Sequence, residues 1–417
     1  MADTMSQNVG QGIKPKGLSG PLFPDIGVVA FVPEEWGGLW MSRHQVLTRL
    51  AKYFHVVWVD QARGWREHWL PGQSAIAPCR DDAVCPPGFI RYRPGRWLPG
   101  LSRPASLGAW MAAQRVRSAK ALLRRQGCGK TVFYLWRPHF AHVLDVATCD
   151  LSCYHIADEY SFSTTEQPLD QVEVELIRRV DQVFIHSPAL LEKKGQFNPH
   201  TLCVPNGVEY ASFAAPHDEP ADVKHIPHPR IGYVGNIKTQ LDLRLLCELA
   251  SQHPEWSLVL VGPKGNLGDD APFVEQLAAM RNVYFLGHKQ AHLVCAYPQY
   301  MDVCVLPYKV NDYTKYIYPL KLHEYLAGGK PIVGTPIRSL LEFAHVIKLA
   351  STQGEWSRAV TESLAPDAIS IDQIEKRRSI ARQFDWGTLV HDIARSMCNR
   401  LGPPYREQFS ARNLETF

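Results

Sequence analysis

Residues 316–335 read YIYPLKLHEYLAGGKPIVGT and combine a short helical segment with a buried strand. Pro319 suits the start of the helix, because the N–H that proline lacks would have no intrahelical acceptor there. Gly328 and Gly329 end the helical pattern, and Pro331 opens an apolar run that suits a strand. A helix that leads directly into a buried strand is typical of α/β folds with a parallel sheet.

The same succession of apolar runs and amphipathic segments extends over most of the chain. Before residue 214 the expected strands are IGVVAFV (26–32), HVVWVD (55–60), TVFYLW (131–136), LSCYHI (151–156), QVFIH (182–186) and TLCV (201–204). After residue 229 they are RIGYVG (230–235), WSLVLVG (256–262), VYFLG (283–287), DVCVLP (302–307) and PIVGT (331–335). Continuous apolar runs suit strands that are buried on both faces. The predicted fold class is α/β, with two Rossmann-like, doubly wound parallel-sheet domains.

A break in composition divides the chain. The segment AAPHDEPADVKHIPHPR (214–230) contains four Pro and no periodicity, so we expect a linker there. The predicted organisation is a disordered tail (1–21), a first domain (22–213), a linker (214–229), a second domain (230–385) and a C-terminal helix with a tail (386–417).

Composition favours an ordinary globular protein. The chain has 417 residues, of which 45% are hydrophobic and 21% charged, and its net charge is only +4. We therefore expect no nucleic-acid partner for the molecule as a whole. The first twenty residues lack an apolar core, and the ten Cys are scattered, as expected for thiols in a reducing compartment. These features predict a cytoplasmic location.

Residues 61–130 differ from the rest of the chain. They contain 13 Lys and Arg against three Asp and Glu, together with four Trp at 65, 69, 97 and 110. This mixture is found where proteins meet an anionic membrane surface or a phosphate-bearing acceptor. The alternative is a solvated basic helix (115–125) beside aromatic side chains packed under a loop. The first interpretation would make the protein peripheral at the inner face of the membrane.

The second domain offers a group of residues suited to a phosphorylated ligand. In open parallel sheets, ligands bind beyond the carboxyl ends of the strands. Gly235, Asn236 and Lys238 directly follow the first strand of that domain, where backbone N–H groups can approach an anion. Lys321 lies in the first turn of a helix, which is unfavourable unless it faces a phosphate, and Glu324 is one turn later. This set suits a ribose diphosphate, although a surface Lys–Glu pair is the alternative.

Taken together, these segments resemble the nucleotide-sugar motif of GT-B glycosyltransferases, particularly the large retaining bacterial family four, or group 1. VPNGVEYASF (204–213) resembles the segment leading out of the first domain, and RIGYVGNI (230–237) the first strand and phosphate loop of the donor domain. ARQFDWGTLV (381–390) resembles the segment before a final helix that packs back on the first domain. WGGLWMSRHQVLTRLAKYFHVVWVD (36–60) and CYHIADEYSF (153–162) resemble a teichuronic-acid-type subgroup.

The resemblance implies two domains facing a cleft and a nucleotide sugar, expected to be a UDP-sugar, as co-substrate. Glu324 would hold the donor ribose, while Lys321 and the loop 235–238 would hold the diphosphate, beside Pro319 and Leu320 at the helix start. The acceptor would be a glycan or a lipid-linked glycan in polysaccharide assembly. Neither a metal nor another cofactor is expected, because the positive charge can stabilise the leaving diphosphate.

Two positions depart from the family pattern. The family often has a Glu eight residues before the one matched by Glu324, and Tyr316 stands there instead. A cationic residue usually follows the glycine-bearing strand, and here it is Asn236. The missing carboxylate leaves open whether the reaction retains or inverts the anomeric configuration.

Strand ends of the first domain supply candidates for the acceptor side. Glu34 and Trp36 follow the first strand, and Arg137 and His139 follow TVFYLW. Asp158 follows LSCYHI, at a place where the resemblance puts an acidic residue. An acceptor hydroxyl needs a base in an inverting reaction, so Asp158 is the predicted catalytic residue. Its alternative role is to cap the next helix.

Two other function classes remain open at this stage. A nucleotide-sugar epimerase of the same fold would need no acceptor surface, and a non-catalytic module on a degenerate fold would bind a membrane or a polyanion. A dinucleotide cofactor is disfavoured, because no Gly-x-Gly-x-x-Gly follows the first strand.

Overall fold

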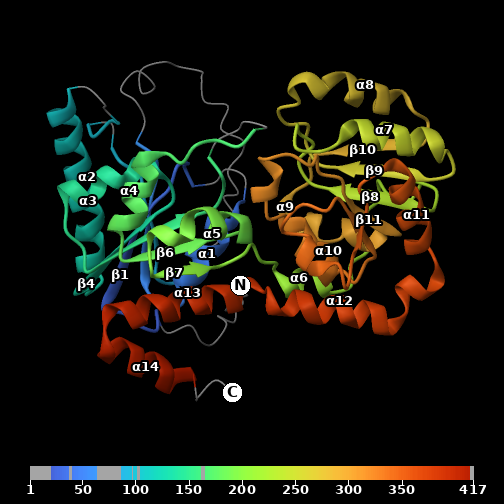
Figure 1. Cartoon of the computed structure of the whole chain (residues 1–417). Coiled ribbons are helices and arrows are strands. Elements are labelled where there is room, and N and C mark those ends of the chain that lie inside the picture. The colour runs from blue at the N-terminus through green and yellow to red at the C-terminus, as the bar shows by residue number, and fades with distance from the viewer. Residues whose placement is uncertain are drawn as a thin grey trace, which may run out of the picture.

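The computed structural model describes residues 20–36, 40–62, 86–95, 97–100, 104–160 and 165–413. These residues form two parallel sheets flanked by helices (Figure 1). The first sheet has seven strands in the order β3-β2-β1-β4-β5-β6-β7, and the second has six in the order β10-β9-β8-β11-β12-β13. The predicted pair of doubly wound α/β domains is confirmed.

The first sheet and its helices take up the chain up to residue 214. The strands are β1 (Ile26–Phe31), β2 (His55–Val59), β3 (Phe89–Tyr92), β4 (Lys130–Leu135), β5 (Leu151–Ile156), β6 (Gln182–Ile185) and β7 (Thr201–Cys203). The helices are α1 (Ser42–Leu50), α2 (Ala105–Arg125), α3 (Val143–Val146), α4 (Gln171–Arg179), α5 (Pro188–Lys194) and α6 (Tyr210–Ala214). Strand β3 was not predicted, and helix α2 begins ten residues before the basic segment in which we expected a helix.

The second sheet begins at Arg230. Its strands are β8 (Arg230–Val234), β9 (Ser257–Val261), β10 (Val283–Gly287), β11 (Val303–Leu306), β12 (Ile332–Gly334) and β13 (Lys348–Leu349). The helices are α7 (Leu243–Gln252), α8 (Ala271–Ala279), α9 (Ala291–Val294), α10 (Leu320–Ala327), α11 (Gln353–Ser363), α12 (Ile371–Gln383), α13 (Trp386–Leu401) and α14 (Pro403–Asn413). Every residue of β1, β2, β5, β8 and β9 is buried, as expected for strands covered on both faces.

The segment 214–229 is not an open linker. Val223 and Ile226 are fully buried in the core of the second domain. Asp222 accepts a hydrogen bond from Tyr297 at 3.0 Å and pairs with Lys289 at 2.7 Å. The sequence pattern did not indicate that Val223 and Ile226 would be buried, because four prolines interrupt it. These two side chains attach the segment to the second domain.

Helix α13 carries the end of the chain back to the first domain (Figure 1). Its residues Trp386, Val390 and Ile393 are buried in the same cluster as β1 and α1. The Asp385 carboxylate begins this helix by accepting a hydrogen bond from the Gly387 N–H at 2.7 Å. The first domain is therefore completed by residues that follow the second domain in sequence.

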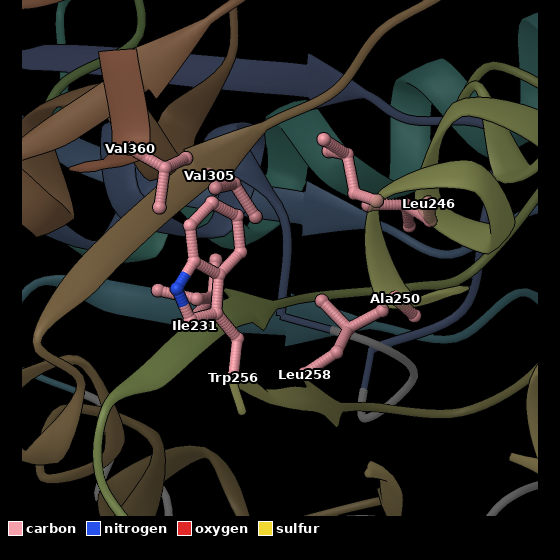
Figure 2. A pocket seen from close by; sticks show the side chains of 8 residues that line it. Ile231, Leu246, Ala250, Trp256, Leu258, Val305 and Val360 are labelled. Carbon is pink, nitrogen blue, oxygen red and sulfur yellow. The ribbon is translucent and has the colours of Figure 1, made fainter. Parts of the chain in front are cut away.

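The core of the second domain contains a small void (Figure 2). Side chains including Ile231, Leu246, Trp256, Val305 and Val360 line a volume of ≈ 10 Å³. Such an apolar space is too small and too poor in hydrogen-bond partners to hold a ligand or an ordered water. In the described ranges, no helix combines the length and the apolar character needed to cross a bilayer.

Candidate active site

The loop after β8 is shaped by glycine. The Gly235 N–H donates to the Val261 carbonyl at 2.7 Å, and the backbone at this position has a φ of 155°. A Cβ atom here would lie 1.8 Å from Cε of Lys321, whose side chain passes directly over the glycine. The close approach of loop and lysine therefore requires a residue without a side chain at position 235.

Lys321 and Glu324 project from the first two turns of α10 toward this loop. Burial raises the pKa of Glu324, and the neighbouring Lys321 ammonium partly offsets that rise. Burial lowers the pKa of Lys238, the Lys321 ammonium lowers it further, and the Asp158 carboxylate acts in the opposite direction. Lys321, whose side chain lies over Gly235 at the carboxyl edge of the second sheet, therefore interacts electrostatically with both Lys238 and Glu324. Pro319 and Leu320 form the start of α10 beside them.

Asn236, which stands where the family pattern has a cationic residue, does not take over the role of that cation. Its Oδ1 atom is buried and lacks a hydrogen-bond donor within the described part of the chain. A Cβ atom on Gly265 would lie only 2.6 Å from that oxygen, so the amide is turned toward the backbone of the neighbouring loop. The positive charge near the glycine loop comes from Lys238 and Lys321.

Asp158 follows β5 and faces the second domain across the space between the two sheets. Burial raises its pKa to about 6, against the lowering effect of Lys238 and Arg137. The hydroxyl of Tyr313, from the second domain, lies 3.5 Å from Oδ1 of Asp158. A carboxylate with this pKa is ionised at neutral pH and remains basic enough to accept a proton.

The residue beside Asp158 belongs to a buried ion-pair network. Glu159 pairs with Lys193 at 3.2 Å and with Lys194 at 3.3 Å, and Lys194 also pairs with Glu173 at 2.8 Å. These contacts fix the end of β5 against α4 and α5. These ion pairs thus hold the loop that carries Asp158 in place.

Arg137 and Arg43 lie on the same side of the site. The Arg137 guanidinium stacks on the Tyr160 ring at 4.1 Å, and Arg43 forms an ion pair with Glu34. Burial lowers the pKa of Arg43 to about 10, with a further contribution from Arg137, whereas Asp158 acts in the opposite direction. Sequence reasoning missed Arg43, although its place in the first turn of the helix after β1 puts it at the ligand-binding edge.

Trp36 and His139, both predicted on the acceptor side, have different surroundings in the structure. Trp36 is only 7% exposed, and its ring packs against Trp58 at 5.0 Å and Phe89 at 4.8 Å. The aromatic core of the first domain encloses the Trp36 ring, and its place on the acceptor side stays a prediction. The His139 ring contacts the Phe140 ring at 4.1 Å in a tilted arrangement, and desolvation, Arg137 and His142 together lower the pKa of His139.

Tyr316, which stands where related sequences have a Glu, points into the first domain. Its ring is 4% exposed, and its hydroxyl donates to the Glu166 carboxylate at 2.6 Å. Lys193 pairs with the same carboxylate at 2.6 Å, and Lys315 forms a further ion pair with it. Desolvation acts to raise the pKa of Glu166, but the hydrogen bonds from these three side chains lower it to about 2. Tyr316 thus joins the two domains in this structure.

Solved structures with the same two-domain arrangement support the fold. The sucrose-phosphate synthase of Thermosynechococcus elongatus matches with a TM-score of 0.63 and 18% identity over 93% of this chain and 100% of that one. HepE of Anabaena, solved in complex with UDP and glucose, matches with a TM-score of 0.61 and 16% identity over 89% of this chain and 99% of that one. The fold is that of the GT-B glycosyltransferases.

Sequence comparison shows what the chain is similar to. Residues 228–363 match the family described as "Glycosyl transferases group 1". TuaH of Bacillus subtilis (strain 168), which is named as a teichuronic acid biosynthesis glycosyltransferase, is 32% identical over 238 residues. That match spans 54% of this chain and 58% of the relative's length. The second domain is therefore similar to glycosyltransferase group 1, and the chain is similar to the teichuronic acid glycosyltransferase TuaH, in line with the resemblance seen in the sequence motifs.

Proposed function

We propose that the protein is a glycosyltransferase that moves a hexosyl group from a nucleoside diphosphate sugar to a glycan or lipid-linked acceptor in cell-surface polysaccharide assembly. The observation that carries this proposal is the convergence of Lys238, Lys321 and Glu324 at one sheet edge, with Asp158 facing them from the other domain. The match of residues 228–363 to a glycosyltransferase family supports it.

The donor would lie on the second domain. Glu324 would accept hydrogen bonds from the two ribose hydroxyls, and Lys321 and Lys238 would pair with the diphosphate. The N–H groups at the start of α10 add positive potential there. As the bond between the sugar and the diphosphate breaks, these charges would stabilise the leaving group without a metal ion. UDP is the proposed nucleotide, since it is the one named with the HepE structure.

Asp158 would act on the acceptor. Its carboxylate would take the proton from the acceptor hydroxyl while that oxygen attacks the anomeric carbon and the nucleoside diphosphate departs. This in-line reaction inverts the anomeric configuration. Arg137 and Arg43 lie beside Asp158 and would orient an anionic or polar acceptor.

The proposed place of work is the cytoplasm, at the surface of the inner face of the membrane. A lipid-linked acceptor is anchored there, and its hydroxyl must reach Asp158. The basic, tryptophan-bearing part of the first domain is consistent with such a location.

A thermal-shift screen against UDP-, GDP- and dTDP-sugars tests the donor site, because a ligand that binds the folded protein raises its melting temperature. We expect one nucleotide class to stabilise the protein, and Glu324→Ala and Lys321→Ala to abolish the shift. Glu248→Ala, an exposed change on α7, serves as the control. The proposal fails if no nucleotide sugar stabilises the parent protein, or if Glu324→Ala responds like the parent.

A further inference from the structure

Helix α2 has two opposite faces of different chemistry. Ala112, Val116, Ala119 and Leu123 are buried and pack toward the sheet, with α2 in contact with β1 and β2. On the opposite side, a second series recurs at alternating spacings of three and four residues, which places it on one face of the helix. It consists of Leu107, Trp110, Gln114, Arg117, Ala121 and Arg124, and we call it the outward stripe.

The outward stripe exposes apolar side chains that soluble proteins usually cover. Trp110 is 53% exposed and Leu107 is 40% exposed. The preceding loop adds Trp97, which is 78% exposed. Arg115 fixes that loop to α2, because its guanidinium donates to the carbonyls of Leu98 at 3.2 Å and Pro99 at 2.7 Å. Helix α2 and the loop bonded to it therefore expose two tryptophans and a leucine.

The segment that carries this surface has charges of a single sign. Residues 86–130 contain ten Lys and Arg and no Asp or Glu. Within the outward stripe, Trp110 and Leu107 occupy the first turns, whereas Arg117 and Arg124 are exposed further along. Figure 1 shows α2 at the outer edge of the first domain, on the side away from the second domain. A partner can reach this surface without blocking the space between the domains.

We propose that the outward stripe and Trp97 form a docking surface for a lipid bilayer rich in anionic headgroups. Tryptophan rings and leucine insert at the level of the headgroups, and arginines beside them pair with lipid phosphates. The absence of acidic residues from 86–130 matches a uniformly anionic partner. This surface deepens the proposed membrane location and rests on it, but it does not depend on the donor site.

Vesicle co-sedimentation tests the surface. Full-length protein should bind vesicles of phosphatidylcholine mixed with phosphatidylglycerol, bind pure phosphatidylcholine vesicles weakly, and dissociate as salt is raised. The pair Leu107→Ser with Trp110→Ser, and the pair Arg117→Gln with Arg124→Gln, should each lower the partition roughly tenfold. Because all four side chains are partly or fully exposed, the variants should keep the parent's melting temperature.

The matched control variants remove exposed apolar or basic side chains from the molecule at positions outside α2. Ile371→Ser on α12 removes an apolar side chain that is 84% exposed, and Arg281→Gln with Arg358→Gln removes two exposed charges from the second domain. These variants should bind vesicles like the parent. In addition, brominated lipids should quench the fluorescence of the parent, and Trp97→Phe with Trp110→Phe should remove most of that quenching.

Three results would overturn the proposal: no binding of the parent to phosphatidylglycerol vesicles, equal loss in the control variants, or unchanged binding when the tryptophans are removed. Should polyphosphate bind equally well to the parent and to the Trp110→Ser pair, the surface would be one for a soluble polyanion instead. A nucleotide-induced thermal shift in the α2 variants separates failure at this surface from failure of the donor site.

Discussion

The carboxyl group of Asp158 is held in an environment that opposes its charge. Burial raises its pKa to about 6, and the cations Lys238 and Arg137 only partly compensate. For a proton acceptor this is a useful value, since the group is ionised at neutral pH but still basic. The rate of sugar transfer should therefore fall by about tenfold per pH unit below pH 6. Initial rates measured across this range, with Asp158→Asn as the inactive reference, check the prediction. A rate that stays flat down to pH 4 would contradict it.

The same raised pKa has a consequence for stability. The ordinary pKa of this carboxyl is 3.8, and folding raises it, so the folded state favours the protonated form. This contribution to stability is complete below pH 3.8 and is lost as the pH rises through about 6. At neutral pH, Asp158→Asn should thus be more stable than the parent, by an amount on the order of 1 kcal/mol. Melting temperatures of both proteins, followed from pH 4 to pH 7, should diverge with increasing pH. If the melting temperatures of the two proteins changed in parallel with pH, the charge on Asp158 would not destabilise the folded protein.

Gly235 provides a second residue-level test. Alanine at this position would place a methyl group 1.8 Å from Cε of Lys321, and the lysine would have to leave the loop. We expect Gly235→Ala to weaken nucleotide-sugar binding by about tenfold or more, because a charge-assisted contact is lost. Isothermal titration with the donor found in the screen measures the change. Gly354→Ala, at a glycine on α11 with open space around it, is the matched control and should bind normally.

At the scale of elements, the periods of apolar residues predicted most strands and several helices correctly. LSCYHI and VYFLG became β5 and β10 with the predicted limits. These periods did not predict segments that are buried by residues far away in the sequence. Phe89–Tyr92 carries an arginine, Arg91, and has no strand-like pattern, yet it pairs with β2 in the sheet. Likewise, nothing near Trp36 indicates that Trp58 and Phe89 enclose its ring.

The candidate site was predictable in part for the same reason. Gly235, Lys321 and Glu324 lie at element ends that the local sequence defines. Arg43 lies in the first turn of the helix after β1, a position at the ligand-binding edge that could have indicated its place, whereas its proximity to Arg137 and Asp158 depends on the tertiary fold. Tyr316 could be recognised as a departure from the family motif, but its pairing with Glu166 depends on how the domains meet.

The start of α13 permits a prediction for one helix. The Asp385 carboxylate accepts hydrogen bonds from the N–H groups of Gly387 at 2.7 Å and Tyr210 at 3.1 Å. Asp385→Ala should cost about 1 kcal/mol or more, because both donors lose their partner. The urea midpoint, followed by tryptophan fluorescence, measures this loss. Ser370→Ala at the start of α12 is the control, since the Ser370 side chain makes no capping bond.

At the scale of the whole molecule, the contact between domains depends on charge. Glu166 binds Lys193, Lys315 and Tyr316, and these bonds lower its pKa to about 2 against the effect of desolvation. A carboxyl with a lowered pKa stabilises the contact above its ordinary value of 4.5, and this contribution is lost as pH falls toward 2. Because the carboxylate is 40% exposed, solvent limits its contribution to no more than about 1 kcal/mol.

Small-angle X-ray scattering tests this contact. Glu166→Gln should give a larger radius of gyration than the parent at neutral pH, and the difference should disappear in acid, where the parent also loses the charge. Glu175→Gln, an exposed change on α4, should leave the radius unchanged. Identical scattering from the parent and Glu166→Gln would mean that other contacts hold the domains together.

The chain crosses between the domains twice, and the two crossings are bonded to each other. The Val208 N–H donates to the Phe384 carbonyl at 2.9 Å, and the Trp386 N–H donates to the Val208 carbonyl at 3.0 Å. Exchange of the second domain for that of another enzyme would therefore need two junctions, one near Val208 and one near Asp385. A chimaera joined at the first point alone would also replace α13, and the buried face of α1 would meet a foreign helix. The second domain is therefore an insert within the first domain, and its exchange replaces an internal segment rather than a terminal one.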